Sequence, residues 1–588
     1  MFNFISKKEL WLPVLILIIV GSFAYSFNLN NQLFWDDDDW IVNNNYVHAI
    51  NWDNVKFWFT HDVLAGVGLS SNYYRPFLFF TFALNYILLG VKPLVYHLTS
   101  NAIHIFNSIL VFWLIKSVFK RNLLAFLTSL FFLIHPLQTE AVTYISGRGD
   151  VLVAMFVLAA LLIFNKNQTA KSFKLYALSL TFLILGLLSR ETAIIFPVLA
   201  LAFYVSVLSK EKFLKSIRNG LIKTWSYFAV VIVYGILRLT ALNFLDTLNF
   251  YTEPNIYSEN FHVRIFTFLP ILWEYLKLLV VPVGLHMERG AVVYTSLFQW
   301  PVWAVFLAII GILASIIRFY RLEIKQPNSN FRIWLLGASW FFIALGPVSG
   351  ITPINALMYE HWLYLPMVGF WLIISFYLVK LLDSLKLRQK TIGYWPLAVG
   401  LFIYLSFFVY QSIQRNILWG NPEEFYKNIL MYEPNNPRIN NNLGNLYLNQ
   451  KNKELSEFYY RKAIEAGDAF AQPYYNLGAV LYARGDIPGA IQLYEKAIEI
   501  NPGFFYPYQD LAVIYARQGN FLKASDNIEK LKLIIPNNPR VYYNSALVHL
   551  ALNNKKKALE DIQKGLELAR LDPETERLLH ELVSQLQK

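Results

Sequence analysis

Four consecutive aspartates follow the first apolar stretch of the chain and are flanked by Trp35 and Trp40. Adjacent carboxylates repel one another, so such a run needs solvent, a cation or a substrate that uses a base. It can therefore be a solvated acidic loop, a general base or an oxygen-rich cation site. Because it lacks the alternating ligand spacing and glycine of a calcium loop, no cofactor is required, and a divalent cation is an alternative. The candidate catalytic residues are Asp36, Asp37, Asp38 and Asp39.

Further polar residues that could contact a phosphate or a sugar lie between or at the ends of the apolar runs. Arginine suits bidentate contacts with phosphate, and charged residues close to a membrane are costly and usually functional. Each one alone could equally be a helix-end ion pair or a side chain that reaches for solvent. The candidate substrate-binding and lipid-phosphate-binding residues are Arg75, His135, Glu140, Arg148, Asp150, Arg190, Lys277, Arg289, Tyr359, Glu360 and His361.

The elements that must position these residues are mostly apolar. Of 588 residues, 56% are hydrophobic and 17% aromatic, and there is no cysteine. Soluble proteins of this length are rarely so apolar, so we predict an all-α, polytopic membrane protein in contact with the lipid bilayer. The formal net charge is +12, but the basic residues of the apolar part gather in short loops. That pattern indicates topology and not nucleic-acid binding.

We predict 11 membrane spans. They lie near 10–28, 95–117, 122–137, 150–165, 173–189, 191–209, 224–243, 300–318, 333–349, 361–382 and 394–414. Two more apolar stretches, 76–90 and 265–283, are ambiguous by length, since a helix needs about 20 residues to cross a bilayer.

The basic loops resolve this ambiguity. If Lys7 and Lys8 are cytoplasmic and both ambiguous stretches stay at the outer face, every basic cluster between spans lies inside, as the positive-inside rule requires. If 76–90 crosses, Lys116 to Arg121 faces outward. We therefore predict a retained N-terminal anchor, a cytoplasmic N-terminus, and the aspartates and C-terminus on a periplasmic or other extracytoplasmic side. The predicted inner residues include Lys120, Lys174, Lys215, Lys325, Arg332, Arg388 and Lys390.

The composition divides the chain into a membrane domain (1–415), which includes a first outer loop (29–94), a connecting helix (416–437) and a polar repeat domain (438–588). Small residues recur every 34 positions in the last part, as in the pair Gly444 and Gly478 and the series Ala490, Ala524 and Ala558. This is the tetratricopeptide pattern. Repeats start near 438, 472, 506 and 540, and 573–587 is a capping helix. Such solenoids present a groove to an extended peptide or a partner helix.

The order of motifs resembles one family. The chain has Phe34-Trp35-Asp36-Asp37, Tyr74-Arg75-Pro76, His135-Pro136 with Thr139-Glu140, Gly147-Arg148 with Asp150, Ser189-Arg190-Glu191, Tyr359-Glu360 and C-terminal repeats. Together these are similar to the transmembrane and tetratricopeptide-repeat-containing O-mannosyltransferases, within the multi-span glycosyltransferases of GT-C type that use polyprenyl-phosphate sugars. The chain size and the lack of cysteine favour a bacterial relative.

The resemblance implies an inverting hexosyltransferase that moves mannose or a similar sugar from a polyprenyl-phosphate carrier to a hydroxyl of a protein or glycan held by the repeats. One of Asp36 and Asp37 would be the general base and the other would orient the acceptor or sugar. Arg148 and Arg190 would lie near the lipid phosphate, and Tyr359 and Glu360 would match the late motif. Two departures are the arginine before Glu191, where the family commonly has lysine, and the longer aspartate run.

Two other hypotheses remain open on the residues alone. One is a non-catalytic membrane scaffold whose repeats recruit a partner and whose aspartates are solvated. The other is a polyprenyl-linked glycan ligase or transporter. Transport predicts charges at the middle of the bilayer and an internal repeat of spans, whereas these charges cluster at one predicted membrane face.

Overall fold

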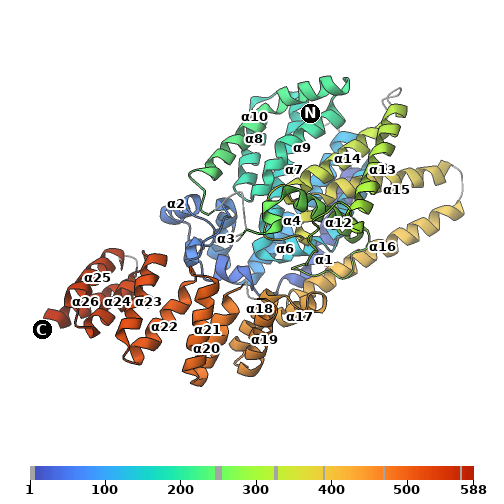
Figure 1. Cartoon of the computed structure of the whole chain (residues 1–588). Coiled ribbons are helices and arrows are strands. Elements are labelled where there is room, and N and C mark those ends of the chain that lie inside the picture. The colour runs from blue at the N-terminus through green and yellow to red at the C-terminus, as the bar shows by residue number, and fades with distance from the viewer. Residues whose placement is uncertain are drawn as a thin grey trace. The chain divides into compact units, whose positions relative to one another are not determined.

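The chain is all-α and folds into two compact units, Met1–Phe425 and Tyr426–Lys588 (Figure 1). The computed structural model describes residues 7–245, 254–323, 329–387, 391–467, 470–569 and 572–587. Among these residues, the β-type pairing is one isolated bridge between Arg289 and Met358. The all-α prediction is confirmed. Of the predicted inner basic residues, Lys325, Arg388 and Lys390 lie outside the described residues.

The first unit consists of long apolar helices joined by short helical turns. Its α-helices are α1 (Lys7–Tyr25), α2 (Trp52–Thr60), α3 (Pro76–Leu89), α4 (Pro93–Phe119), α5 (Asn122–Ile134), α6 (Gln138–Thr143), α7 (Arg148–Ala170), α8 (Phe173–Leu187), α9 (Phe196–Phe203), α10 (Phe213–Leu239), α11 (Ile256–Glu259), α12 (Phe261–Val280), α13 (Trp300–Glu323), α14 (Ser329–Leu345), α15 (Met367–Leu387) and α16 (Thr391–Leu418). Helix α17 (Pro422–Tyr432) contains the boundary between the units.

Eight helical segments in the described part of the chain are long and apolar enough to cross a membrane. They are Trp11–Asn28, Pro93–Phe119, Ile145–Ala170, Glu191–Leu208, Phe213–Leu239, Asn330–Val348, Met367–Leu385 and Trp395–Leu418. Shorter apolar helices occupy Pro76–Leu89, Asn122–Ile134, Phe173–Leu187 and Trp300–Gly311. Each predicted span therefore contains an apolar helix, although only these eight meet the length expected for a full crossing.

Two helix starts differ from the prediction. Helix α10 begins at Phe213, earlier than the predicted 224, because its first half carries lysine and arginine among apolar residues and reads as polar. Helix α15 begins at Met367, later than the predicted 361, because a 3-10 turn (Glu360–Leu363) and Pro366 precede it. Proline lacks the backbone N–H and restricts the preceding residue, so it separates the two elements.

The two ambiguous helices, α3 and α12, contact other segments at both ends. At the start of α3, the N–H of Phe77 donates to the carbonyl of Leu188 (2.9 Å), and near its end Tyr86 stacks on His48. At the start of α12, Arg264 donates to the carbonyl of Gly350 (2.8 Å). At its end, the carbonyl of Leu279 pairs with a ring nitrogen of His135 (3.1 Å).

A buried polar cluster joins helices that are far apart in sequence. Thr143 of α6 donates to the side chain of Asn416 at the end of α16 (2.5 Å) and accepts from Asn28 after α1 (3.0 Å). Asn28 also pairs with Asn101 of α4 (3.0 Å), and Asn31 donates to the carbonyl of Asn416 (2.8 Å). Because buried polar groups are costly unless they are paired, this cluster holds the start of the segment that follows α1 against α4, α6 and α16.

The second unit contains paired helices that stack in sequence order (Figure 1). The pairs are α18 (Pro437–Asn449) with α19 (Lys453–Glu465), α20 (Gln472–Arg484) with α21 (Ile487–Ile500), α22 (Phe505–Arg517) with α23 (Phe521–Ile534) and α24 (Pro539–Ala551) with α25 (Lys555–Leu568), followed by α26 (Pro573–Gln587). A Cβ at Gly444 would lie 2.3 Å from the ring of Tyr460, and one at Gly478 would lie 2.7 Å from Tyr494. Glycine at these two positions therefore lets the first helix of the pair lie against the tyrosine ring of the second.

Candidate active site

The aspartate run lies on a distorted helical turn that begins beside a strained residue. Trp35 has φ of 65°, a left-handed conformation that is rare for bulky residues. Asp38–Val42 form a single π-helical turn, which is itself uncommon and frequent at functional sites. The surrounding packing must hold Trp35 in place, because such strain persists only where the structure over-determines it. The ring of Trp35 packs edge-on against Phe425 (6.1 Å).

The four carboxyl groups have different environments. Asp36 is partly exposed and accepts a hydrogen bond from the hydroxyl of Tyr144 (2.5 Å). Asp37 is 3% exposed, and its Oδ1 accepts from the backbone N–H (2.8 Å) and hydroxyl (2.6 Å) of Ser146. Asp38 and Asp39 are more exposed than Asp37. The run is therefore split between one buried, fully oriented carboxyl group and three that reach the surface.

Burial also separates the protonation behaviour of Asp37 from that of an ordinary carboxyl. Desolvation raises the pKa of Asp37 from 3.8 to about 7, and the hydrogen bonds from Ser146 only partly oppose this. Neighbouring Asp36 and Asp38 raise it further, because like charges disfavour ionisation. Burial is also the main cause that raises the pKa of Asp38 and of Asp39. The charge of Asp39 raises the pKa of Asp38 further, and the charge of Asp36 does the same for Asp39.

Arg75 joins the aspartate-bearing segment to the segment after α8. Its guanidinium lies over the rings of Trp40 (5.4 Å) and Tyr73 (4.5 Å), and its Nε lies 3.5 Å from Glu191. The same Glu191 accepts from the backbone N–H of Tyr74 (3.0 Å). Arg75 therefore packs against the aspartate turn through aromatic rings and against Glu191 through charge.

A second polar group brings together four of the predicted residues. Glu140 of α6 lies 2.5 Å from Nδ1 of His361, whereas Arg190 forms an ion pair with Asp150. Nε2 of His361 lies 3.4 Å from the guanidinium of Arg190 and 3.9 Å from Asp150. Burial, and then the charge of Glu360, raises the pKa of Glu140, so this carboxyl favours its protonated form and can donate to His361.

A third group surrounds Glu360, which is fully buried. Its Oε1 accepts from Arg289 (2.9 Å) and from the backbone N–H of His286 (2.9 Å), and its Oε2 accepts from Arg415 (2.7 Å). Two guanidinium groups thus face one carboxylate. The adjacent Tyr359 donates its hydroxyl to Glu288 (3.0 Å), whose backbone is left-handed with φ of 57°. The predicted residues Arg289, Tyr359 and Glu360 are therefore neighbours.

Three predicted residues lie apart from these groups. Arg148 is completely buried and donates to Ser100, Thr81, Asn85 and the carbonyl of Tyr96, so protein acceptors occupy its guanidinium. His135 is buried against Phe408 and Trp371. Lys277 is half exposed and pairs with Glu274 (2.7 Å), one turn earlier in α12. These contacts favour structural roles for all three.

Sequence reasoning missed two residues of these groups, Arg415 and Tyr144. Arg415 directly follows the last apolar run, where an arginine reads as an ordinary end of a span. Its place on α16, in the same helical stripe as Phe408 and Ser412, could have revealed it, since both lie on the buried face. Tyr144 gave no comparable signal, because an aromatic residue between apolar residues reads as core.

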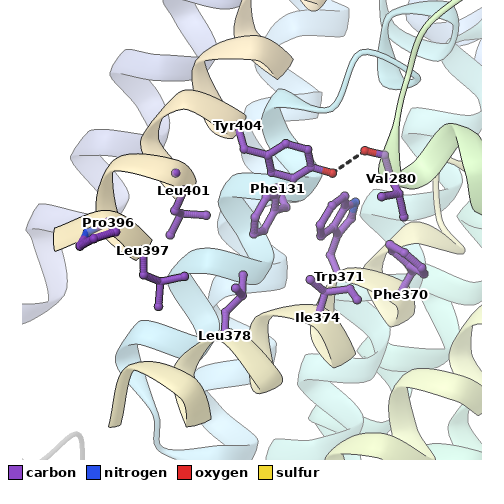
Figure 2. Close-up of a pocket in the computed structure, with 11 residues that line it drawn as sticks. Phe131, Val280, Phe370, Trp371, Ile374, Leu378, Pro396, Leu397, Leu401 and Tyr404 are labelled. Carbon is purple, nitrogen blue, oxygen red and sulfur yellow. Dashed lines mark hydrogen bonds between the residues drawn. The ribbon is translucent and has the colours of Figure 1, made fainter. Parts of the chain in front are cut away.

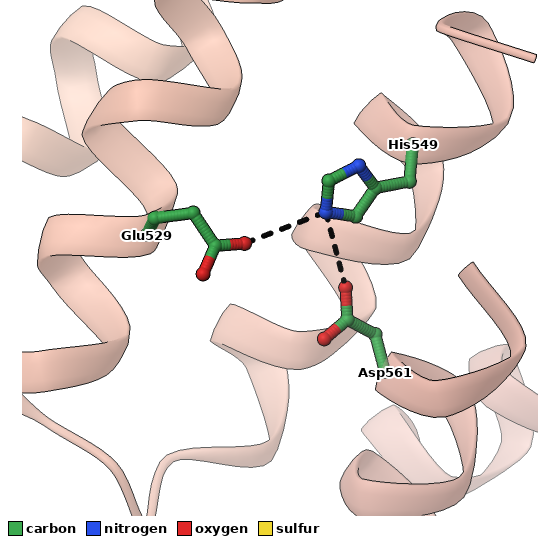
Figure 3. A group of neighbouring side chains, drawn as sticks. All are labelled: Glu529, His549 and Asp561. Atoms are coloured by element: carbon green, nitrogen blue, oxygen red, sulfur yellow. Dashed lines mark hydrogen bonds and ion pairs between the residues drawn. The ribbon is translucent and has the colours of Figure 1, made fainter. Parts of the chain in front are cut away.

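The described residues contain one group of three potential metal ligands within 4.8 Å of one another, Glu529, His549 and Asp561, and it lies in the repeat unit (Figure 3). Nζ of Lys532 lies 2.9 Å from Glu529 and 2.6 Å from Asp561. This ammonium already neutralises both carboxylates at the place a cation would take, so the group is an ion-pair network. A cation at Asp36 to Asp39 stays a prediction.

Comparisons with known proteins agree with both parts of the chain. Sequence models of the tetratricopeptide repeat match residues 437–466, 471–504, 493–524 and 539–570. The predicted repeat array is thus confirmed. A crystal structure of MamA protein was also matched, with 25% identity and a TM-score of 0.23 over 25% of this chain and 80% of that chain.

The relatives extend across the apolar helices as well. The chain is 26% identical to protein O-mannosyl-transferase F38B6.6 of Caenorhabditis elegans, over 78% of this chain and 63% of the relative. It is 26% identical to human protein O-mannosyl-transferase TMTC1 over 78% of this chain and 55% of the relative, and 25% identical to mouse TMTC4 over 76% and 65%. The chain thus spans about half to two thirds of their length. These matches confirm the resemblance predicted from the motifs: over most of its length, this membrane protein is a relative of the transmembrane and tetratricopeptide-repeat-containing O-mannosyltransferases.

Proposed function

We propose that the protein is a membrane glycosyltransferase that moves mannose or a similar hexose from a polyprenyl-phosphate carrier to a hydroxyl of a protein acceptor. The observation that carries this proposal is that the aspartate turn contacts Tyr144 and Ser146, which lie between α6 and α7. These two helices carry Glu140 and Asp150 of the charged group around His361. The names of the relatives, which are protein O-mannosyl-transferases, support the reaction class.

Asp36 is the proposed general base. A base must reach the proton that it accepts, and Asp36 is partly exposed while Asp37 is buried. The acceptor oxygen would bond to the anomeric carbon on the face opposite the phosphate, with inversion. Asp36 would take the hydroxyl proton as the carbon–oxygen bond to the phosphate breaks. Asp37, held by Ser146, would position the turn that carries Asp36.

The leaving phosphate needs positive charge, because negative charge develops on its oxygen in the transition state. Arg289 and Arg415 are the proposed partners, since two guanidinium groups there share one carboxylate. Arg190 and His361 remain candidates for orienting the sugar. Arg148 is proposed as a positioning residue instead, because it is completely buried among the protein acceptors named above, whereas 14% of the Arg289 side chain is exposed.

We also propose the topology predicted from the basic loops, with the aspartates and the repeats on the extracytoplasmic side. The contacts at both ends of α3 and α12 support it. Arg264 at the start of α12 meets Gly350, and Leu279 at its end meets His135. Both partners belong to the predicted outer ends of spans, as expected for a helix that does not cross. The repeats are then the proposed binding module for the acceptor.

The test is mannose transfer to endogenous proteins in native membranes, with a long-chain polyprenyl-phosphate mannose as donor. Removing a general base lowers the rate by roughly 10²–10⁴-fold, so Asp36→Asn should lose nearly all transfer. The matched control, Asp38→Asn, changes an exposed carboxyl of the same turn and should keep most of the activity. Unchanged transfer in all four single Asp→Asn variants would leave the protein as a scaffold.

A further inference from the structure

An apolar cavity of about 420 Å³ lies among α5, α15, α16 and the end of α12. Its walls are aromatic and branched side chains, together with Pro396 and Gly400 of α16 (Figure 2). Phe131 and Trp371 stack within it, with ring centroids 4.1 Å apart. A single hydrogen bond, from the hydroxyl of Tyr404 to the carbonyl of Val280 (2.6 Å), lies at its edge.

This cavity opens where apolar residues of α16 are exposed. Pro396 and Gly400 are exposed, and so are the neighbouring Val399, Phe402 and Ile403 of α16. Only 11% of the 18-residue apolar window within Trp395–Leu418 is buried inside the protein. An opening surrounded by exposed apolar residues of a membrane-spanning helix meets hydrocarbon, so the natural occupant is a hydrocarbon chain that enters from the bilayer.

One face of α16 connects the cavity with the charged group around Glu360. Leu397, Leu401 and Tyr404 line the cavity, and the residues that follow on the same stripe are Phe408, Ser412 and Arg415. The spacing of three to four residues keeps all six on one side of the helix. Arg415 lies 11 positions after Tyr404, a rise of about 16 Å at 1.5 Å per residue.

A second route joins the same two places. Val280 lines the cavity, and the chain continues through Val281 and Val283, which are both about half exposed, to Arg289. The two valines extend the exposed apolar surface beyond the cavity, and the chain then passes through the buried Leu285, His286 and Met287 to the guanidinium group. A ligand that fits both ends has an apolar tail and a head with negative charge.

We propose that this cavity holds part of the prenyl tail of the polyprenyl-phosphate donor, while the phosphate reaches Arg289 and Arg415. The inference rests on the proposed function for the identity of the donor. Two guanidinium groups share the single carboxylate of Glu360, which leaves one positive charge in excess. A polyprenyl phosphodiester has a net charge of −1 and matches it, whereas the headgroup of a bulk zwitterionic lipid is neutral overall. The volume lies within the range of about 300–1,000 Å³ that is usual for ligand sites.

Gly400 provides a sharp test. No atom lies within 4 Å of a Cβ built there, and its φ is not in the left-handed region. Gly400→Leu should therefore fold and fill the cavity. Gly235 on α10 also has open space around its Cβ and lies outside the cavity, so Gly235→Leu is the matched control. Leu397→Trp is a second filling variant at the same place.

The first experiment compares donors with and without a long tail. Wild type should show a lower KM for long-chain polyprenyl-phosphate mannose than for an analogue with two isoprene units. Gly400→Leu and Leu397→Trp should raise the long-chain KM by about tenfold, the equivalent of about 1.4 kcal/mol, and leave the short-chain KM and kcat unchanged. If both filling variants keep the wild-type preference for the long chain, the cavity does not hold the tail.

The second experiment does not depend on catalysis. A photoreactive long-chain polyprenyl phosphate should crosslink to peptides of α15 and α16 in wild type and in Gly235→Leu, and should fail to do so in Gly400→Leu. Excess unlabelled polyprenyl phosphate should compete, and excess phosphatidylcholine should not. Equal competition by phosphatidylcholine would make this a site for bulk lipid and overturn the inference. If crosslinking behaves as expected and no transfer occurs, only the proposed reaction fails.

Discussion

Asp37 illustrates how one residue can be fixed in place and yet remain sensitive to pH. Because its pKa rises from 3.8 to about 7 on burial, the folded protein favours the protonated form. This group therefore contributes stability that is fully present below about pH 4 and is lost as the pH rises through about 7. Ionisation at neutral pH places a charge beside Ser146 with little solvent.

Replacing Asp37 with asparagine should therefore flatten the pH dependence of stability. The amide keeps an oxygen that accepts from Ser146 and cannot ionise. We expect the melting temperature of Asp37→Asn, measured in detergent micelles, to gain on wild type from pH 5 to about pH 7 and to level off above that. Asp53→Asn, which changes an exposed aspartate of α2, should run parallel to wild type. Parallel curves for both variants would contradict a raised pKa at Asp37.

At the residue level, the sequence predicted which charged side chains come together more reliably than it predicted the partners that each of them contacts. Glu360 and Arg289 were both predicted and are in contact, but their third member, Arg415, lies 55 residues from Glu360 in the chain. Arg148 was predicted to bind phosphate, yet it is surrounded by protein acceptors. Residue type shows that a charge is present, whereas only the fold shows which groups already satisfy it.

At the scale of the elements, a pair of glycines, Gly337 and Gly369, forms a close contact between α14 and α15. A Cβ at Gly369 would lie 2.3 Å from the carbonyl oxygen of Gly337 and 2.8 Å from the backbone nitrogen of Phe341. Backbone atoms cannot move aside as flexible side chains can. Small residues at such crossings let helices pack closely in membranes, and here they bring the start of α15 and its preceding turn toward α14.

We expect Gly369→Ala to destabilise the protein by about 1–3 kcal/mol, the usual cost of overpacking a tight contact. The variant should unfold at a lower temperature in detergent, measured by circular dichroism. Gly400→Ala is the matched control, because the added methyl group meets open space and favours helix over glycine. If Gly369→Ala melts at the wild-type temperature, the glycine contact between α14 and α15 does not limit stability.

The elements were the most predictable level of this protein. Each apolar run predicted as a span contains an apolar helix, and the 34-residue period located the repeats, because hydrophobicity and small residues at helix contacts act locally. The exact ends were less predictable. The amphipathic first half of α10 reads as loop, and the turn Glu360–Leu363 reads as helix until its ion pairs are known.

At the scale of the whole molecule, sidedness is the property that most needs a measurement. The chain has no cysteine, so a single introduced cysteine is a unique label. Asp53→Cys and Gln518→Cys should react with a membrane-impermeant maleimide in intact cells. Lys174→Cys, in a predicted inner loop, should react only after permeabilisation. All three positions are exposed. Labelling of Lys174→Cys in intact cells would invert the proposed topology.

Helix α16 makes the two proposed halves of the donor site mechanically dependent on each other. One end lines the hydrocarbon cavity, and the other holds Glu360 through Arg415 and the buried asparagine cluster through Asn416. A tilt of the helical segment between Tyr404 and Arg415 would move both ends, so we expect the occupancy of the cavity and the environment of Glu360 to be coupled. Such coupling is reciprocal in free energy. We therefore expect tail binding in the cavity and phosphate binding at Arg289 and Arg415 to strengthen or weaken each other by the same factor.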